Sequence, residues 1–304
     1  MTEPGGTGDV VRDVLDAMAP LAAGAQSTPT AEWVTTLHDS GIGRLSVETL
    51  FEVVYELAAL DGSLGWLAAM FNTAAHDVAG LPDVSLVAAS HRVGGELVNR
   101  RLTGRWGSVV GAEYADWLLL TVSDGDARRR VLLPRDCVRI DPVRPRIGLE
   151  AAGVCDVTVT DLAVGEGWMS ETWSADAHLV AAAAAATAVV GSADGVWRKH
   201  VGEVRARLVT SFGSGEVTEE KSAQVAATAS DIDMAKLQVT TPNRAADAAR
   251  AYRQAIVRAR DAADRLLDSS RHALDGADPV SRQWRDVHAG YSLALQLLDA
   301  LDPA

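Results

Sequence analysis

LTGRWGSVVGAEYADWLLL, residues 102–120, is the stretch of sequence that decides the expected fold. Its glycines separate short runs of β-branched, aromatic and aliphatic residues, which favours strands joined by tight turns over helices. A second run of this kind, Cys155 to Val164, follows about forty residues later. The middle of the chain is therefore expected to be β structure.

Short β-type runs continue on both sides of this stretch, separated by turn-forming residues such as Gly94-Gly95, Asp124-Gly125-Asp126 and Pro142. Strands at this spacing are typical of an antiparallel sandwich or barrel, so residues 85–170 are predicted to form a central β domain. The basic cluster Arg128-Arg129-Arg130 is predicted to be a solvated hairpin turn. The predicted strands are Leu86 to Ala89, Glu96 to Val98, Trp117 to Val122, Arg130 to Leu133, Val138 to Ile140 and Val157 to Val159.

Residues 1–84 are predicted to form an N-terminal helical domain. Apolar residues recur at helical spacing from Val10 to Leu21, with the helix ending at Pro20 and the stretch Gly24 to Pro29. A short helix follows over Thr30 to His38. Ser46 is a candidate N-cap for a helix over Val47 to Leu60. Asp61-Gly62-Ser63 then ends that helix and caps the next, Leu64 to Phe71.

Residues 171–304 are predicted to form a C-terminal four-helix bundle that also serves oligomerisation. Helix begins at Ala175 and includes the run Ala181 to Ala186, whose high helix propensity and small side chains suit close packing. Further helices are predicted over Glu219 to Leu237, Pro242 to Leu267 and Pro279 to Leu301. The chain is therefore expected to have an α+β fold in three parts.

Composition excludes several classes of function. The formal charge of −13 argues against nucleic acid, because phosphate binding needs a cationic surface. Cys137 and Cys155 have no metal-ligand spacing, so no metal site or disulfide framework is expected. An uninterrupted run of eighteen apolar residues is absent, and Met1 to Asp16 carries acidic residues and glycines in place of a signal sequence. We expect a cytoplasmic protein that binds no membrane.

Three motifs in order along the chain resemble the acyl-CoA dehydrogenase superfamily, and its flavin-dependent monooxygenase (hydroxylase-like) branch in particular. The Leu-x-Gly-x-Trp segment from Leu102 resembles the hairpin that lies against the flavin in that superfamily. Ala58 to Trp66 resembles its Ala-x-x-Asp-x-Ser-x-x-Trp segment, and Arg282 to His288 resembles its Arg-x-Trp-Arg-Asp-x-His signature. Compared with members of the superfamily, this chain is shortened and its flavin motifs are altered.

The resemblance implies a flavin, FAD or FMN, that is reduced by a separate flavin reductase and transfers an oxygen atom to a small aromatic or amine-bearing metabolite. The chain has no Gly-x-Gly-x-x-Gly element, so NADH needs another protein. The implied cofactor-binding residues are Trp106, Ser108, Gly111, Arg205 and Arg207. The implied substrate-binding residues are Trp66, Trp284 and Tyr291, and the implied catalytic residues are His288 and His76, whose imidazoles can exchange a proton with a phenol near neutral pH.

Two alternatives stay open. Val110 replaces the Ser or Thr that precedes Gly111 in the family, and Val209 replaces the arginine before Phe212-Gly213. These changes suit a derivative that has lost flavin and acts as a cofactor-free cavity enzyme, such as a cyclase, or as a partner subunit. An acyl-CoA dehydrogenase proper needs a catalytic carboxylate, for which Glu219 and Glu220 are the available pair, although their place before a helix indicates an N-terminal charge effect.

Assembly is predicted from two stripes of the C-terminal region. The alanine-rich helix Ala181 to Ala188 and the apolar face of Tyr291 to Leu301 would both be exposed in a monomer. We expect a homodimer or homotetramer, with a heteromer containing a paralogous subunit as the alternative.

Overall fold

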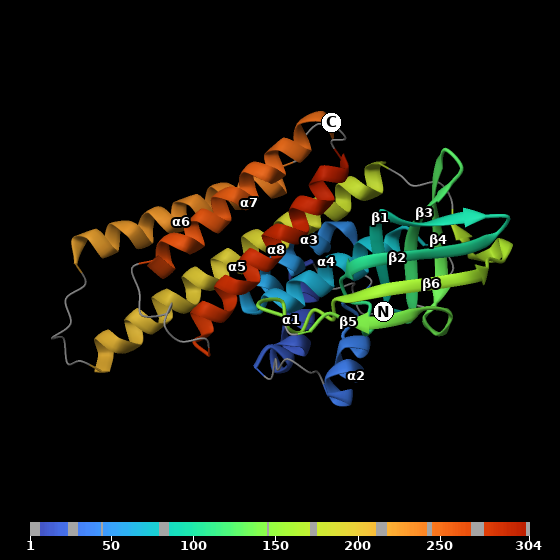
Figure 1. Cartoon of the computed structure of the whole chain (residues 1–304). Helices are drawn as coiled ribbons and strands as arrows, with labels where there is room; N and C mark the ends of the chain where they lie inside the picture. Colours follow the sequence, from blue (N-terminus) through green and yellow to red (C-terminus); the bar gives the residue numbers. More distant parts are fainter. Residues whose placement is uncertain are drawn as a thin grey trace, which may run out of the picture.

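The computed structural model describes residues 7–23, 30–43, 45–78, 85–144, 146–170, 175–210, 218–241, 245–268 and 277–301. Helices from both ends of the chain pack together, and a β-sheet lies at one end of them (Figure 1). The predicted α+β organisation into N-terminal helices, a central sheet and a C-terminal bundle is confirmed. The Phe212-Gly213 element lies outside the described residues.

The N-terminal helices are α1 (Thr7–Ala23), α2 (Ala31–Asp39), α3 (Val47–Leu60) and α4 (Gly62–His76). Asp61 caps α4 as predicted, since its side chain accepts hydrogen bonds from the backbone N–H groups of Ser63 and Leu64. Ser46 is the N-cap residue of α3, but its hydroxyl contacts the Thr49 hydroxyl in place of a backbone N–H. Two predicted ends were wrong: α1 continues through Pro20, and α4 continues past Phe71.

The sheet has seven strands in the order β5-β6-β2-β1-β3-β4-β7. Its pairings are antiparallel, as predicted, except that β1 and β3 run parallel. It is a single mixed sheet rather than a sandwich or barrel. The strands are β1 (Val87–Val98), β2 (Arg101–Val109), β3 (Trp117–Asp124), β4 (Ala127–Pro134), β5 (Arg139–Pro142), β6 (Cys155–Ala163) and β7 (Met169–Ser170).

The predicted turn at Gly94-Gly95 was wrong. Both glycines lie inside β1, which joins two predicted strands into one and carries register irregularities between Ser90 and Gly95. A Cβ atom on Gly94 or Gly95 would lie 2.5 or 2.7 Å from the Trp106 indole. Gly94 and Gly95 therefore leave room for the Trp106 indole, which packs against the backbone of β1.

The predicted solvated turn at Arg128-Arg129-Arg130 was also wrong. All three arginines belong to β4, and the turn itself is formed around Gly125, whose φ is +60°. Arg130 is buried, and its Nη1 lies 2.6 Å from Oδ2 of Asp77 at the end of α4. A buried ion pair thus joins the sheet to the N-terminal helices.

The C-terminal helices are α5 (Ala175–Thr210), α6 (Glu219–Thr240), α7 (Ala245–Asp268) and α8 (Pro279–Leu301). Helix α5 runs through the centre and contacts α3, α4, α6, α7 and α8. Its apolar stretch is long enough to cross a membrane, but it is the buried core of the bundle. Gly191 and Gly195 let α3 approach so closely that a Cβ atom on either would lie 2.4 Å from an α3 carbonyl oxygen.

The alanine run of α5 is covered within the single chain. Residues Ala181 to Ala186 are at most 4% exposed, because α5 is surrounded by the other helices. The argument that this run would be exposed in a monomer was therefore wrong. Assembly has to be argued from other surfaces.

Candidate functional site

Two adjoining cavities lie where the end of β2 meets α8. The outer cleft has a volume of about 500 Å³ and includes the loop between β5 and β6. The inner cavity is smaller, about 50 Å³, and is bordered by α4 and β1. Ser108 and Leu293 line both, so the two spaces are neighbours on either side of these residues. The outer cleft is lined by Ser108, Val143, Arg146, Ile147, Gly148, Val154, Trp284, Arg285, His288, Ala289, Ser292 and Leu293.

A histidine–carboxylate pair stands at the outer cleft. Nε2 of His288 lies 2.7 Å from Oδ1 of Asp264 on α7, and Nε1 of Trp284 donates to the same oxygen at 2.6 Å. The ring centroids of Trp284 and His288 lie 4.4 Å apart, and the ring planes are tilted by 52°. Asp264 thus fixes one ring nitrogen of His288, an arrangement that orients an imidazole for proton transfer. The predicted residues Trp284 and His288 come together here.

Asp264 was missed by sequence reasoning. It lies in a helix rich in acidic and basic residues, and no motif distinguishes it from neighbours such as Asp261. Its partner His288 is 24 positions away on the next helix. Only the packing of α7 against α8 brings the two together.

Ser108 lies at a strained position at the end of β2. Its φ is +56°, a left-handed conformation that non-glycine residues adopt at a cost of about 1–2 kcal/mol. The backbone N–H of Ser108 donates to Oδ1 of Asp156 at 3.2 Å. Asp156 is held in turn by Arg105, and this hydrogen bond keeps its pKa below the usual range. The Ser108 hydroxyl makes no hydrogen bond within the described part of the chain and borders both cavities.

Two predicted cofactor residues have packing roles. Trp106 is only 1% exposed, donates from Nε1 to the Thr121 carbonyl oxygen at 2.8 Å, and lies over the glycines of β1. It lines neither cavity, so its indole does not provide a floor for a flavin ring there. Gly111, with φ of +75°, is packed against Phe71, and its N–H donates to the Ala152 carbonyl.

Trp66 lines the inner cavity, and its Nε1 faces Gly290 of α8. The other predicted residues lie away from both spaces. Nε2 of His76 lies 3.0 Å from the Leu45 carbonyl oxygen, and Tyr291 faces α7, where its ring lies 4.5 Å from the Arg260 guanidinium. Neither side chain lines the outer cleft with His288.

Arg205 and Arg207 are near the end of α5 that points away from the sheet (Figure 1). Thirty residues of helix separate Arg205 from Ala175 beside the sheet, a length of about 45 Å. Arg207 lies 4.0 Å from Glu203 of its own helix. Within one chain these arginines are remote from the cleft.

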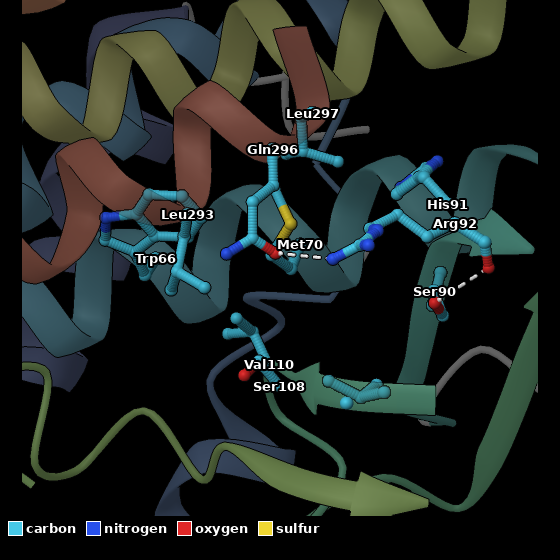
Figure 2. A pocket seen from close by; sticks show the side chains of 13 residues that line it. Trp66, Met70, Ser90, His91, Arg92, Ser108, Val110, Leu293, Gln296 and Leu297 are labelled. Atoms are coloured by element: carbon cyan, nitrogen blue, oxygen red, sulfur yellow. Dashed lines mark hydrogen bonds between the residues drawn. The ribbon is translucent and has the colours of Figure 1, made fainter. Parts of the chain in front are cut away.

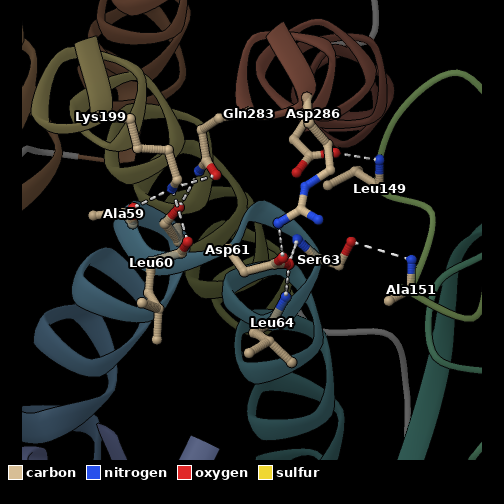
Figure 3. A network of polar contacts seen from close by, with 12 residues as sticks. Ala59, Leu60, Asp61, Ser63, Leu64, Leu149, Ala151, Lys199, Gln283 and Asp286 are labelled. Carbon is tan, nitrogen blue, oxygen red and sulfur yellow. Dashed lines mark hydrogen bonds and ion pairs between the residues drawn. The ribbon is translucent and has the colours of Figure 1, made fainter. Parts of the chain in front are cut away.

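A buried polar network holds the loop that forms one wall of the cleft (Figure 3). Oδ1 of Asp286 accepts the Leu149 N–H at 2.6 Å, and the Ser63 hydroxyl accepts the Ala151 N–H at 3.3 Å. Gly148 has no room for a side chain, because a Cβ atom would lie 2.3 Å from the Arg285 carbonyl oxygen. The loop is thereby fixed to α8 next to His288.

The charges of this network strongly affect one another. Burial and then the charge of Asp61 raise the pKa of Asp286 to about 7, and burial likewise raises the pKa of Asp61. Burial lowers the pKa of Lys199 to about 8, although its Nζ donates to the Leu60 carbonyl and to Gln283 at 2.9 Å. Arg282 completes the group, 3.5 Å from Asp61.

The three-part architecture and the cleft between sheet and bundle define an acyl-CoA dehydrogenase-like fold. Butyryl-CoA dehydrogenase from Megasphaera elsdenii superposes with a TM-score of 0.77 over 98% of both chains, at 14% identity. The HsaA monooxygenase of M. tuberculosis superposes with a TM-score of 0.80 over 94% of this chain and 93% of that one, at 22% identity. No family model matches the chain.

In sequence, the chain is related to oxygenase subunits of flavin-dependent monooxygenases. It is 27% identical to the oxygenase subunit HsaA of Rhodococcus jostii in an alignment that covers 79% of this chain and 78% of the relative. Two further similar structures contain flavin. XiaF from a Streptomyces species, with FADH2 and glycerol, superposes with a TM-score of 0.77 at 17% identity over 97% and 95% of the chains. TdsC from a Paenibacillus species, with FMN and indole, gives 0.69 at 16% identity over 95% of both.

Proposed function

We propose that this chain is the oxygenase component of a flavin-dependent monooxygenase that acts on a small aromatic or amine-bearing metabolite, with reduced flavin supplied by a separate reductase. The observation that carries the proposal is one cleft of about 500 Å³ that has the Ser108 hydroxyl on its sheet side and the His288–Asp264 pair on its helical side. This volume is in the range of ligand sites in proteins.

The residues of the outer cleft fit a flavin ring. Val143, Val154 and Leu293 supply apolar surface, and the Ser108 hydroxyl is available to hydrogen-bond a ring heteroatom. Arg146 adds a guanidinium whose pKa is lowered by burial, so a bound group with negative character would be favoured there. These residues would hold the flavin, whose chemistry, when it is bound, is the activation of oxygen.

FMN and FAD make different demands on the chain. Because Arg205 and Arg207 are remote from the cleft of their own chain, they would contact the phosphates of FAD only from a second copy in a homodimer or homotetramer. FMN needs no such contact. A dependence of FAD affinity on Arg205, with FMN affinity unchanged, would support the oligomer.

The chain's own residues provide acid–base chemistry. His288, which lines the cleft, would accept the proton of a phenol or an N–H group as the substrate ring becomes electron-rich, and later return it. Asp264 orients the imidazole through its hydrogen bond to Nε2. Trp284 holds Asp264 by a second hydrogen bond, which keeps the carboxylate in place for this role.

The alternatives are less well supported by this geometry. None of the described residues that line the outer cleft is a carboxylate, and Glu219 and Glu220 are exposed in the first turn of α6, so a dehydrogenase has no base there. Flavin binding distinguishes the proposed monooxygenase from a cofactor-free enzyme or a partner subunit, since neither of these would bind flavin. Val110 is buried and offers no donor, and Val209 is exposed without a guanidinium, which are the features that favour flavin loss.

The test is titration of the purified protein with FMN and FAD, oxidised and anaerobically reduced, followed by flavin fluorescence and absorbance. We expect binding at about micromolar flavin, and oxygen-dependent turnover of phenols or indoles when a flavin reductase is added. His288→Asn should lower turnover about 100- to 10,000-fold while flavin affinity changes little. Asp264→Asn should lower it less, and Asp261→Asn, on the same helix but paired with Arg260, is the control.

Absence of flavin binding at about 100 µM would contradict the monooxygenase and favour the cofactor-free alternative. Full activity of His288→Asn would remove this residue from the chemistry.

A further inference from the structure

The inner cavity has a cationic wall. Figure 2 shows the Arg92 side chain extending from β1 toward Gln296 on α8, where its Nη1 lies 3.4 Å from Oε1 of the amide. No carboxylate of the described residues pairs with Arg92, and none of the described residues lining the cavity is acidic. Arg92 is an exposed residue, so its guanidinium can be reached from solvent as well as from the cavity.

Polar groups behind Arg92 also lack partners. His91 lines the cavity and is 6% exposed, yet neither of its ring nitrogens has a hydrogen-bond partner among the described residues. Its ring packs edge-on against His178 at 5.1 Å. Buried polar groups in folded proteins are nearly always hydrogen-bonded, so these ring nitrogens are candidate partners for a bound ligand.

Arg130 strengthens the positive character of this wall. One terminal nitrogen pairs with Asp77, while its Nε and other terminal nitrogen are buried without a partner in the described part of the chain. Burial, and after it the charges of Arg130 and His178, lower the pKa of His91 well below its ordinary value. The positive potential around His91 disfavours a proton on its ring. The same potential would attract an anion.

We propose that the inner cavity binds a carboxylate of the substrate, with Arg92 as its charged partner and with the amide of Gln296 and the imidazole of His91 as hydrogen-bond donors. Guanidinium and carboxylate match as a two-pronged pair, and such charge-assisted bonds are the strongest available to a protein. The ligand is a substrate only if the proposed function holds. Carboxylate binding itself does not depend on flavin.

Size determines how such a substrate would lie. A cavity of about 50 Å³ holds a carboxylate and one methylene group but no aromatic ring. Because Ser108 and Leu293 border both cavities, we place the ring of an aromatic acid in the outer cleft, with its carboxylate passing these two side chains to reach Arg92. The substrate class is therefore an aromatic compound with a short carboxylate side chain.

The test is calorimetric titration of the full chain, without flavin, with 4-hydroxyphenylacetate, its neutral amide 4-hydroxyphenylacetamide, and acetate. We expect the aromatic acid to bind at least about tenfold more tightly than either the amide or acetate. Arg92→Gln should reduce the preference for acid over amide to about onefold. Arg12→Gln, which removes an exposed guanidinium paired with Asp9 far along the chain, should keep the preference and serves as the control.

Equal affinity for acid and amide in the native protein, no binding of the acid at about 10 mM, or an unchanged preference in Arg92→Gln would each overturn the proposal. Acetate binding as tightly as the aromatic acid would overturn the substrate class. Flavin titration distinguishes the two proposals: if flavin binds and the acid preference is absent, only the carboxylate site is wrong. If the preference is present without flavin binding, the monooxygenase is wrong and the site stands.

Discussion

Two polar clusters flank α8, and they differ in how fully their groups are paired. Around Asp61 and Asp286, buried carboxylates meet backbone N–H groups and the cations of Lys199 and Arg282. At the inner cavity, the buried His91 has no hydrogen-bond partner within the described residues. Each unsatisfied buried group costs about 1–3 kcal/mol. The first cluster stabilises an arrangement of helices and loop, and the second retains a cost that a ligand could offset.

Breaking the first cluster should have the largest effect. Asp61→Ala removes the cap of α4 and one of the two buried carboxylates that face Arg282 and Lys199, so the free energy of unfolding should fall by about 3–5 kcal/mol. Urea unfolding measures this. Asp9→Ala, which breaks an exposed pair with Arg12, should cost no more than about 1 kcal/mol. A loss below about 1 kcal/mol for Asp61→Ala would mean that water replaces this carboxylate without difficulty.

The pH dependence of stability tests whether the first cluster is also strained by its own charges. The pKa of Asp286 is raised to about 7 in the folded protein, so the folded state holds the proton that the unfolded state has released. Stability should therefore fall as pH rises from about 4 to 7, by up to about 1.4 kcal/mol per pH unit. The pKa of Lys199 is lowered to about 8 in the folded protein. Its contribution to the free energy of unfolding therefore rises with pH only between about 8 and 10.5.

Asp286→Asn separates these contributions. The amide oxygen can still accept the Leu149 N–H, but the group no longer titrates beside Asp61. The slope between pH 5 and about 7 should become shallower, and the variant should gain on the native protein as pH rises. Parallel stability curves for the two proteins would show that Asp286 keeps an ordinary pKa.

Sequence reasoning succeeded where the signal is local. The cap at Asp61 and the bounds of α8 follow from residues within one turn of the helix end. It failed where the cause is distant: Gly94-Gly95 serves the Trp106 ring from another strand, and Asp264 meets His288 only after α7 packs on α8. The resemblance identified His288 and Trp284 at the cleft, but the length of α5 carries Arg205 away from it.

The smallest expected effect sharpens the comparison at the cleft itself. Ser108→Gly removes the left-handed strain of about 1–2 kcal/mol, while added freedom of the unfolded chain returns about 0.4–1 kcal/mol. The variant should be more stable by about 0.5 kcal/mol. Loss of the hydroxyl should weaken flavin binding about two- to tenfold, the worth of one hydrogen bond.

Asn99→Gly is the matched control, since Asn99 also has a positive φ of 50° but lies in the turn between β1 and β2. Its flavin affinity should equal that of the native protein. Opposite changes in stability and binding for Ser108→Gly alone would show that the strain at the end of β2 is tied to the ligand site. If Ser108→Gly lowers stability, the added freedom of the unfolded chain outweighs the relief of backbone strain, because glycine keeps the backbone N–H that Ser108 donates to Asp156.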